Sequence, residues 1–136
     1  MRPGYARALK NRAAAYSALK QPESARADLD EAVRLGSRPD KDGDTIFRDA
    51  LHQRALLRLK ADDDKDGAID DLDRAIQVDP SFASAFFWRG MLRDALGDRD
   101  RAIADRERNR ELEPKGEWQV LHYESRNRRR HRPWQR

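Results

Sequence analysis

The chain has 136 residues, about one domain, of which 40% are charged and 38% hydrophobic, and its net charge is +4. A single compact core would be thin at this composition, whereas a layered structure tolerates it because each layer buries only one face. The absence of cysteine excludes disulfide bonds and thiolate metal sites, and no apolar run reaches the length of a membrane span.

Apolar residues recur at spacings of three and four along several segments, which is the pattern of one buried helix face. The predicted helices cover residues 6–18, 23–35, 46–61, 66–78, 82–96 and 99–112, and a seventh covers about 117–126. Pro80 and Pro114 end two of these helices, because proline disfavours helix in the residue before it. The segment SRPDKDGD, residues 37–44, is typical of a loop. No segment has a strand pattern, so an all-α fold is expected.

Three of the predicted helices are similar to one another in sequence. AIDDLDRAIQVDP (68–80) and AIADRERNRELEP (102–114) align without a gap, so that the first alanines and the last prolines of the two segments coincide. An earlier copy, ARADLDEAVRLGS (25–37), precedes them at a longer spacing. The extra residues fall in the predicted loop over 37–44. Repetition at a constant period predicts stacked copies of one helix pair.

This unit resembles the tetratricopeptide repeat, a helix-turn-helix of about 34 residues with small residues at fixed positions and a closing proline. With Ala6, Asp49 and Ala83 as first positions, the family's alanine at position 20 falls on Ala25, Ala68 and Ala102. The resemblance covers about residues 3–116, and it implies a right-handed α-solenoid of antiparallel helix pairs with repeats at about 6–39, 49–82 and 83–116. A capping helix at about 117–125 would complete a domain over 1–125 and leave 126–136 as a basic tail that we expect to be disordered.

The acidic stretch DDDKDGAIDDLD, residues 62–73, has an alternative interpretation. Its acids and Gly67 fall at the spacing of a calcium-binding loop. The repeat needs the same residues for a short turn and for a helix from about Asp66, so the two structures exclude each other. Acids at a helix start also favour its positive end without any metal. We therefore predict no metal site, with calcium binding at 62–73 as the less favoured alternative.

Catalytic patterns are lacking in the sequence. Its histidines are His52, His122 and His131, and no phosphate loop or nucleophile-histidine-carboxylate set accompanies them. His52 falls at a packing position of its helix. The prediction is a chain that is not an enzyme and carries no cofactor.

The resemblance implies instead a scaffold for protein–protein interaction, whose first helices line a concave groove for a partner peptide. The family's groove positions carried onto this chain are Arg7, Lys10, Asn11, Gln53, Arg54, Leu57, Lys60, Ser84, Phe87, Trp88, Met91 and Trp118. One end is basic and the other aromatic, which favours a partner with acidic and hydrophobic residues. One subfamily binds the C-terminal carboxylate of heat-shock chaperones with a five-residue clamp. Only Lys10 of that clamp is present here, so binding by that mechanism is not predicted.

The basic tail offers a second candidate function. The chain's whole net positive charge lies within residues 117–136. The clustered arginines are Arg126, Arg128, Arg129, Arg130 and Arg132. Such a cluster could bind nucleic acid or another anionic surface without base specificity. We expect a cytoplasmic location, because the N-terminal sequence MRPGYARALKNR has no apolar signal core.

Overall fold

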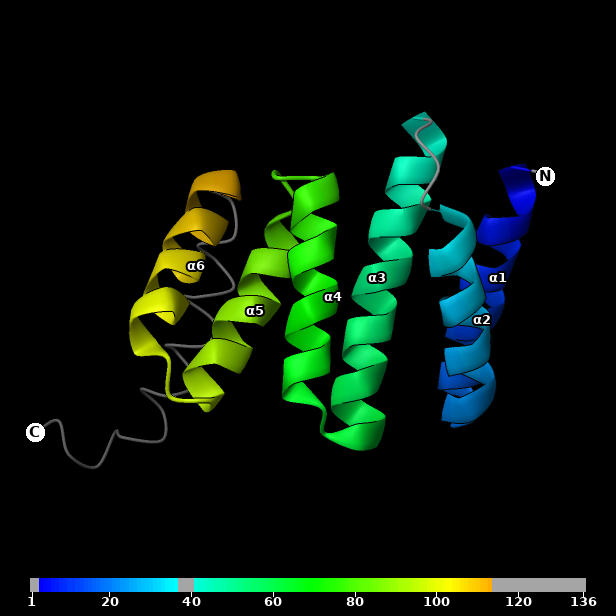
Figure 1. Cartoon of the computed structure of the whole chain (residues 1–136), viewed down its shortest axis with the longest axis horizontal. Coiled ribbons are helices and arrows are strands. Elements are labelled where there is room, and N and C mark those ends of the chain that lie inside the picture. Colours follow the sequence, from blue (N-terminus) through cyan, green and yellow to red (C-terminus); the bar gives the residue numbers. More distant parts are fainter. Residues whose placement is uncertain (1–2, 37–40, 114–136) are drawn as a thin grey trace, which may run out of the picture.

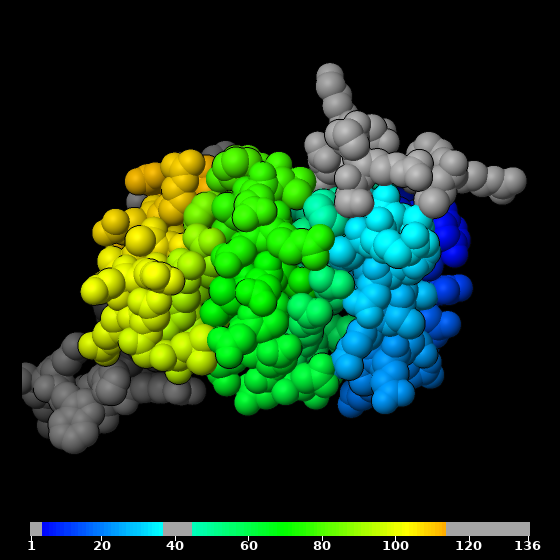
Figure 2. Space-filling model, viewed as in Figure 1, coloured from blue at the N-terminus to red at the C-terminus, as the bar shows by residue number. Residues whose placement is uncertain are grey.

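The computed structural model describes residues 3–36 and 41–113, which form three antiparallel helix pairs (Figure 1). The helices are α1 (Pro3–Ala18) and α2 (Pro22–Gly36), α3 (Lys41–Asp62) and α4 (Lys65–Val78), and α5 (Ala83–Ala95) and α6 (Arg99–Leu112). Between the pairs, α2 packs on α3 and α4 packs on α5. Figure 2 shows these pairs as one continuous packed body, which we call the stack. The prediction of an all-α structure built from antiparallel pairs is confirmed.

The bounds of the helices agree with the predicted ones to within one residue except at the starts of α1 and α3, which lie earlier than predicted, at Pro3 and Lys41. Because α3 begins at Lys41, the predicted loop over 37–44 is wrong in its second half. Gly43 lies inside this helix. A glycine inside a helix costs only about 1 kcal/mol relative to alanine, and tertiary packing overrides that cost. No helix within residues 3–36 and 41–113 is long and apolar enough to cross a membrane.

Two clusters of buried apolar side chains hold the stack together. The first cluster includes Leu29 of α2 and Leu51 of α3, and it joins the first pair to the second. The second cluster includes Leu72 of α4 and Leu92 of α5, and it joins the second pair to the third. A Cβ atom built on Gly90 of α5 would lie 3.2 Å from Cβ of Asp105 in α6, so a small residue is needed where these helices cross.

The turn inside each pair places one residue in the left-handed region of the backbone. These residues are Lys20 (φ 58°), Asp63 (φ 51°) and Gly97 (φ 87°). All three occupy the same position of the repeat. Glycine adopts this conformation freely, whereas a side chain costs about 1 kcal/mol there.

The acidic stretch 62–73 contains one of these turns. Residue 62 ends α3, Asp63 and Asp64 form the turn, and α4 runs from Lys65. The Asp64 side chain caps α4 by accepting a hydrogen bond from the Gly67 N–H at 2.9 Å. A twelve-residue calcium loop would need open backbone where α4 is already helical. In the part of the chain that the structure describes, no group of three or more histidines and acids could hold a metal ion.

Asp63→Gly is expected to raise the free energy of unfolding by about 0.5–1 kcal/mol, because it removes the left-handed strain. Its ion pair with Lys65 is a surface contact and contributes little. Urea unfolding monitored by circular dichroism measures the change. The matched control is Gly97→Ala, which introduces the same strain into the third turn and should destabilise by about 1 kcal/mol. An unfolding midpoint below that of the parent chain for Asp63→Gly would contradict the argument.

Candidate interaction surface

Each helix pair contains a buried aspartate held by an arginine of its partner helix. In α2, α4 and α6 the aspartates are Asp28, Asp71 and Asp105, which are 6%, 1% and 3% exposed. Their arginine partners in α1, α3 and α5 are Arg12, Arg54 and Arg89. Each arginine donates through Nε and Nη2 to both carboxylate oxygens, at distances between 2.6 and 3.1 Å. We call these three two-point contacts the clasps.

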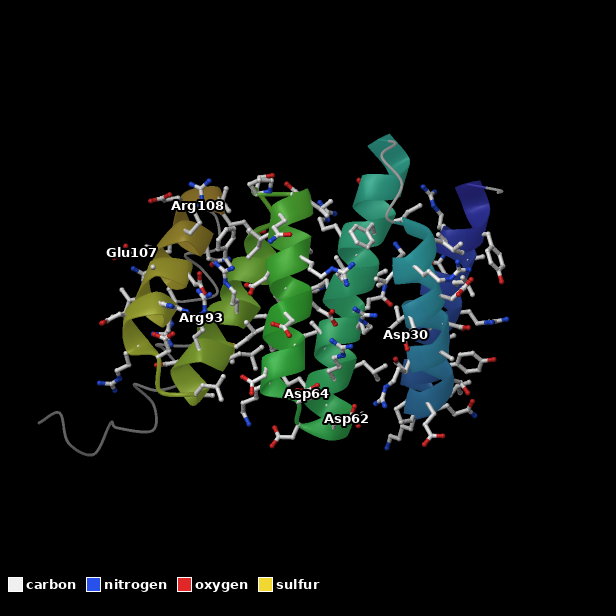
Figure 3. All side chains as sticks on the ribbon, viewed as in Figure 1. Asp30, Asp62, Asp64, Arg93, Glu107 and Arg108 are labelled. Carbon is white, nitrogen blue, oxygen red and sulfur yellow. The ribbon has the colours of Figure 1, made fainter. Side chains whose placement is uncertain are left out.

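Two of the clasps also connect neighbouring pairs. Nη1 of Arg54 donates to Asp30 of α2 at 3.0 Å, and Nη1 of Arg89 donates to Asp73 of α4 at 2.8 Å. Asp30 and Asp73 occupy one position of the repeat. Arg54 and Arg89 therefore bind one acid within their own pair and another acid on the preceding pair. Figure 3 shows Asp30 on the side of α2 that faces α3.

Hydrogen bonds favour the charged forms of Asp28 and Arg54 in the first two clasps. Hydrogen bonds from Arg12 hold the pKa of Asp28 below its ordinary value. Hydrogen bonds to Asp71 raise the pKa of Arg54. Each two-point contact joins the first helix of a pair to the second helix with defined geometry.

His52 of α3 is half-buried, as its packing position predicts. It occupies the repeat position of Leu9 and Phe86, which are both buried. Its ring packs edge-on against Phe82 with the centroids 5.3 Å apart. Burial lowers the pKa of His52, and among the described residues its Nε2 atom has no hydrogen-bond partner. His52 is therefore a packing residue of α3.

The predicted groove residues divide into three classes in the structure. Exposed side chains are Arg7, Asn11, Lys60, Phe87 and Met91. Half-buried ones are Lys10, Gln53, Ser84 and Trp88, and buried ones are Arg54 and Leu57. Trp118, the predicted capping helix and the basic tail lie outside the described residues.

Arg54 and Leu57 belong to the interior of the stack. The Arg54 side chain is 11% exposed, and its guanidinium binds Asp71 and Asp30. Leu57 is 8% exposed and packs in the first cluster. We therefore leave both residues out of the candidate interaction surface, which corrects the sequence-based assignment. A signal for the clasps was present in the sequence, because aspartate recurs at one repeat position as Asp28, Asp71 and Asp105.

The remaining surface of the first helices has one apolar end, on α5. Phe87 is 43% exposed and Met91 is 46% exposed. The ring of Phe87 meets that of Trp88 edge-on with the centroids 5.6 Å apart. At the opposite end, on α1, Arg7 and Asn11 are exposed, while Lys10 lies 3.5 Å from Asp49 of α3. The apolar end can accept hydrophobic side chains, and the α1 end can donate hydrogen bonds.

Comparison with solved structures identifies similar folds, whereas no protein-family model and no curated protein matches the chain. A crystal structure of MamA is 25% identical with a TM-score of 0.67, and the match covers 82% of this chain and 60% of that one. The second TPR of Spaghetti (RPAP3), bound to the HSP90 peptide SRMEEVD, is 25% identical with a TM-score of 0.68, and the match covers 81% of this chain and 94% of that one. The first TPR of the same protein is 24% identical with a TM-score of 0.70, over 84% of this chain and 83% of that one. The predicted right-handed solenoid of tetratricopeptide type is thereby confirmed.

Proposed function

We propose that this tetratricopeptide-repeat chain is a non-enzymatic scaffold that binds a segment of a partner protein on the surface of α1, α3 and α5. A similar structure, the second TPR of Spaghetti, holds a short HSP90 peptide. The observation that carries the proposal is the exposed pair Phe87 and Met91 on α5. Aromatic and methionine side chains are enriched where proteins bind one another.

The apolar end is suited to anchor one or two hydrophobic side chains of the partner. Trp88 is half-buried against the second cluster, so it supports Phe87 from within the stack. A rigid aromatic anchor loses little conformational entropy on binding.

The charged residues favour acids elsewhere in the same partner segment. Arg7 on α1 and Lys60 on α3 are exposed and carry positive charge. Arginine forks bind carboxylates at two points. Such contacts orient a bound segment and raise its association rate more than they raise affinity. We therefore propose a partner segment that combines acidic with hydrophobic residues.

Peptide selection on the full chain tests this proposal. A display library of random twelve-residue peptides should yield binders that combine Asp or Glu with Leu, Phe or Met. The double variant Phe87→Ala/Met91→Ala is expected to weaken a selected peptide by about tenfold or more, as measured by fluorescence anisotropy. The matched control is Ile103→Ala, which removes an equally exposed apolar side chain from α6. Equal weakening by both variants, or by neither, would contradict the proposal.

A further inference from the structure

One side of α1 repeats positions that are buried in the later first helices. Leu51 of α3 packs in the first cluster against α2, and Ala85 and Leu92 of α5 pack in the second cluster against α4. The matching residues of α1 are Ala8, which corresponds to Leu51 and Ala85, and Ala15, which corresponds to Leu92. Both alanines are exposed. In α3 and α5 this side packs on the second helix of the preceding pair. Among the described residues, no second helix lies against the same side of α1.

The clasp of α1 lacks the contact that the other two clasps make with the preceding second helix. Arg54 and Arg89 use Nη1 to bind an acid of the preceding second helix. Arg12 uses only Nε and Nη2, both on Asp28, and its side chain is 59% exposed. In the part of the chain that the structure describes, Nη1 of Arg12 has no hydrogen-bond partner. An acid on a packed second helix would complete this clasp.

The matching acid lies at the other end of the stack. Glu107 of α6 occupies the repeat position of Asp73 and Asp30. Its side chain is exposed and has no partner within residues 3–36 and 41–113. Figure 3 shows Glu107 on the side of α6 that points away from the stack. Ile103 of α6, at the repeat position of Ile69, is 50% exposed.

We propose that copies of this chain associate head to tail, with α6 of one copy packed on α1 of the next. Glu107 accepts the Nη1 hydrogen bond of Arg12, and Ile103 packs on Ala8 and Ala15. This contact repeats between chains what α2 with α3 and α4 with α5 make within one chain. Two different faces meet in it, so the association forms open rows of copies and not closed dimers.

The charge pattern of α6 makes this association weak and sensitive to salt. Arg106 and Arg110 stand at the repeat positions of Leu72 and Ile76, so the outer side of α6 buries less apolar surface than α4 does. Part of the attraction is the Arg12–Glu107 pair, which is exposed before contact and is screened at high ionic strength. Association should therefore increase with protein concentration and decrease when sodium chloride is added.

Analytical ultracentrifugation of the full chain, from about 10 µM to about 1 mM, tests the proposal. The average mass should rise above the monomer value of 15.8 kDa with concentration. Two variants block one face each. Ala8→Lys/Ala15→Lys crowds the α1 face with exposed charge and leaves the Arg12–Asp28 contact in place, and Glu107→Lys reverses the charge on α6. Each variant alone is expected to remain a monomer.

A mixture of the two blocked variants gives the decisive result. The first variant retains its α6 face and the second retains its α1 face, so a 1:1 mixture should form a heterodimer and nothing larger. A parent chain that stays monomeric at about 1 mM, or a mixture that stays monomeric, would overturn the proposal. The melting temperature gives a second test. If the parent chain is monomeric and Glu107→Lys lowers its melting temperature, the chain's own residues 114–136 are the partner of α6, and the proposal is overturned. Glu107→Gln, a milder change at the same exposed position, guards against misfolding and should weaken association in the same direction.

Discussion

Asp71→Ala is expected to lower the free energy of unfolding by about 3–5 kcal/mol, because it leaves a buried arginine without its main partner. Asp71 is 1% exposed and binds both Nε and Nη2 of Arg54. Arg58 also lies 3.1 Å from the same carboxylate. The substitution therefore leaves two guanidinium groups beside an apolar methyl. Urea unfolding of Asp71→Ala and of the parent chain measures the loss.

The adjacent residue offers a matched control. Asp70 is exposed on α4, and Asp70→Ala should change the free energy of unfolding by less than about 0.5 kcal/mol. Replacement of both clasp partners, Arg54→Met with Asp71→Leu, should recover most of the lost stability, since no charge then stays buried alone. If Asp71→Ala is no more destabilising than Asp70→Ala, the clasp does not stabilise the stack.

Leu51→Ala is expected to cost about 2–5 kcal/mol, the range for removing a fully buried leucine that leaves a cavity. Leu51 is 0% exposed and lies in the first cluster, where α3 packs on α2. In a stack, each pair is stabilised mainly by its immediate neighbours. The cavity should therefore loosen the first pair from the second.

Amide hydrogen exchange can locate this loss. In Leu51→Ala, amides of α1 and α2 should exchange faster, while those of α5 and α6 should change less. Leu19→Ala removes the same side chain from a position that is 66% exposed, and it should leave both stability and exchange nearly unchanged. Uniform acceleration across all six described helices would mean that the stack unfolds as one unit and that local loosening is absent.

Much of the fold could be predicted from sequence because it is built from local, repeated signals. Alanine at the three matching positions Ala25, Ala68 and Ala102 is 0% exposed in the structure, as a packing position of the repeat requires. The acidic stretch 62–73 resembles a calcium loop by itself, but at the period of the repeat it aligns with a turn and a second helix, which the structure confirms. Prediction was weaker at the start of α3, where no sequence pattern marks the boundary.

The candidate surface could be predicted only in part. Phe87 and Met91 are exposed as expected, because their repeat positions lie on the open side of α5. Arg54 was assigned to the surface from its repeat position and its charge. In the structure it turns inward, where Asp71 and Asp30 on two different helices accept charge-assisted hydrogen bonds from it. A repeat position gives the direction of a side chain only approximately.

The sequence alone determined the helix pairs of residues 3–36 and 41–113, their period and their turns, because these depend on residues close together in the chain. Only the tertiary structure decided which arginines are buried in clasps and which face outward. Arg12, Arg54 and Arg89 find their aspartates 16 or 17 residues away, and two of them find a second acid on another pair. A charged side chain is buried only where stacking brings its partners within hydrogen-bonding distance. For that reason only the stacked structure shows that Arg12 and Glu107 occupy the places of the donor and the acceptor in the contact that Arg54 makes with Asp30 and Arg89 makes with Asp73.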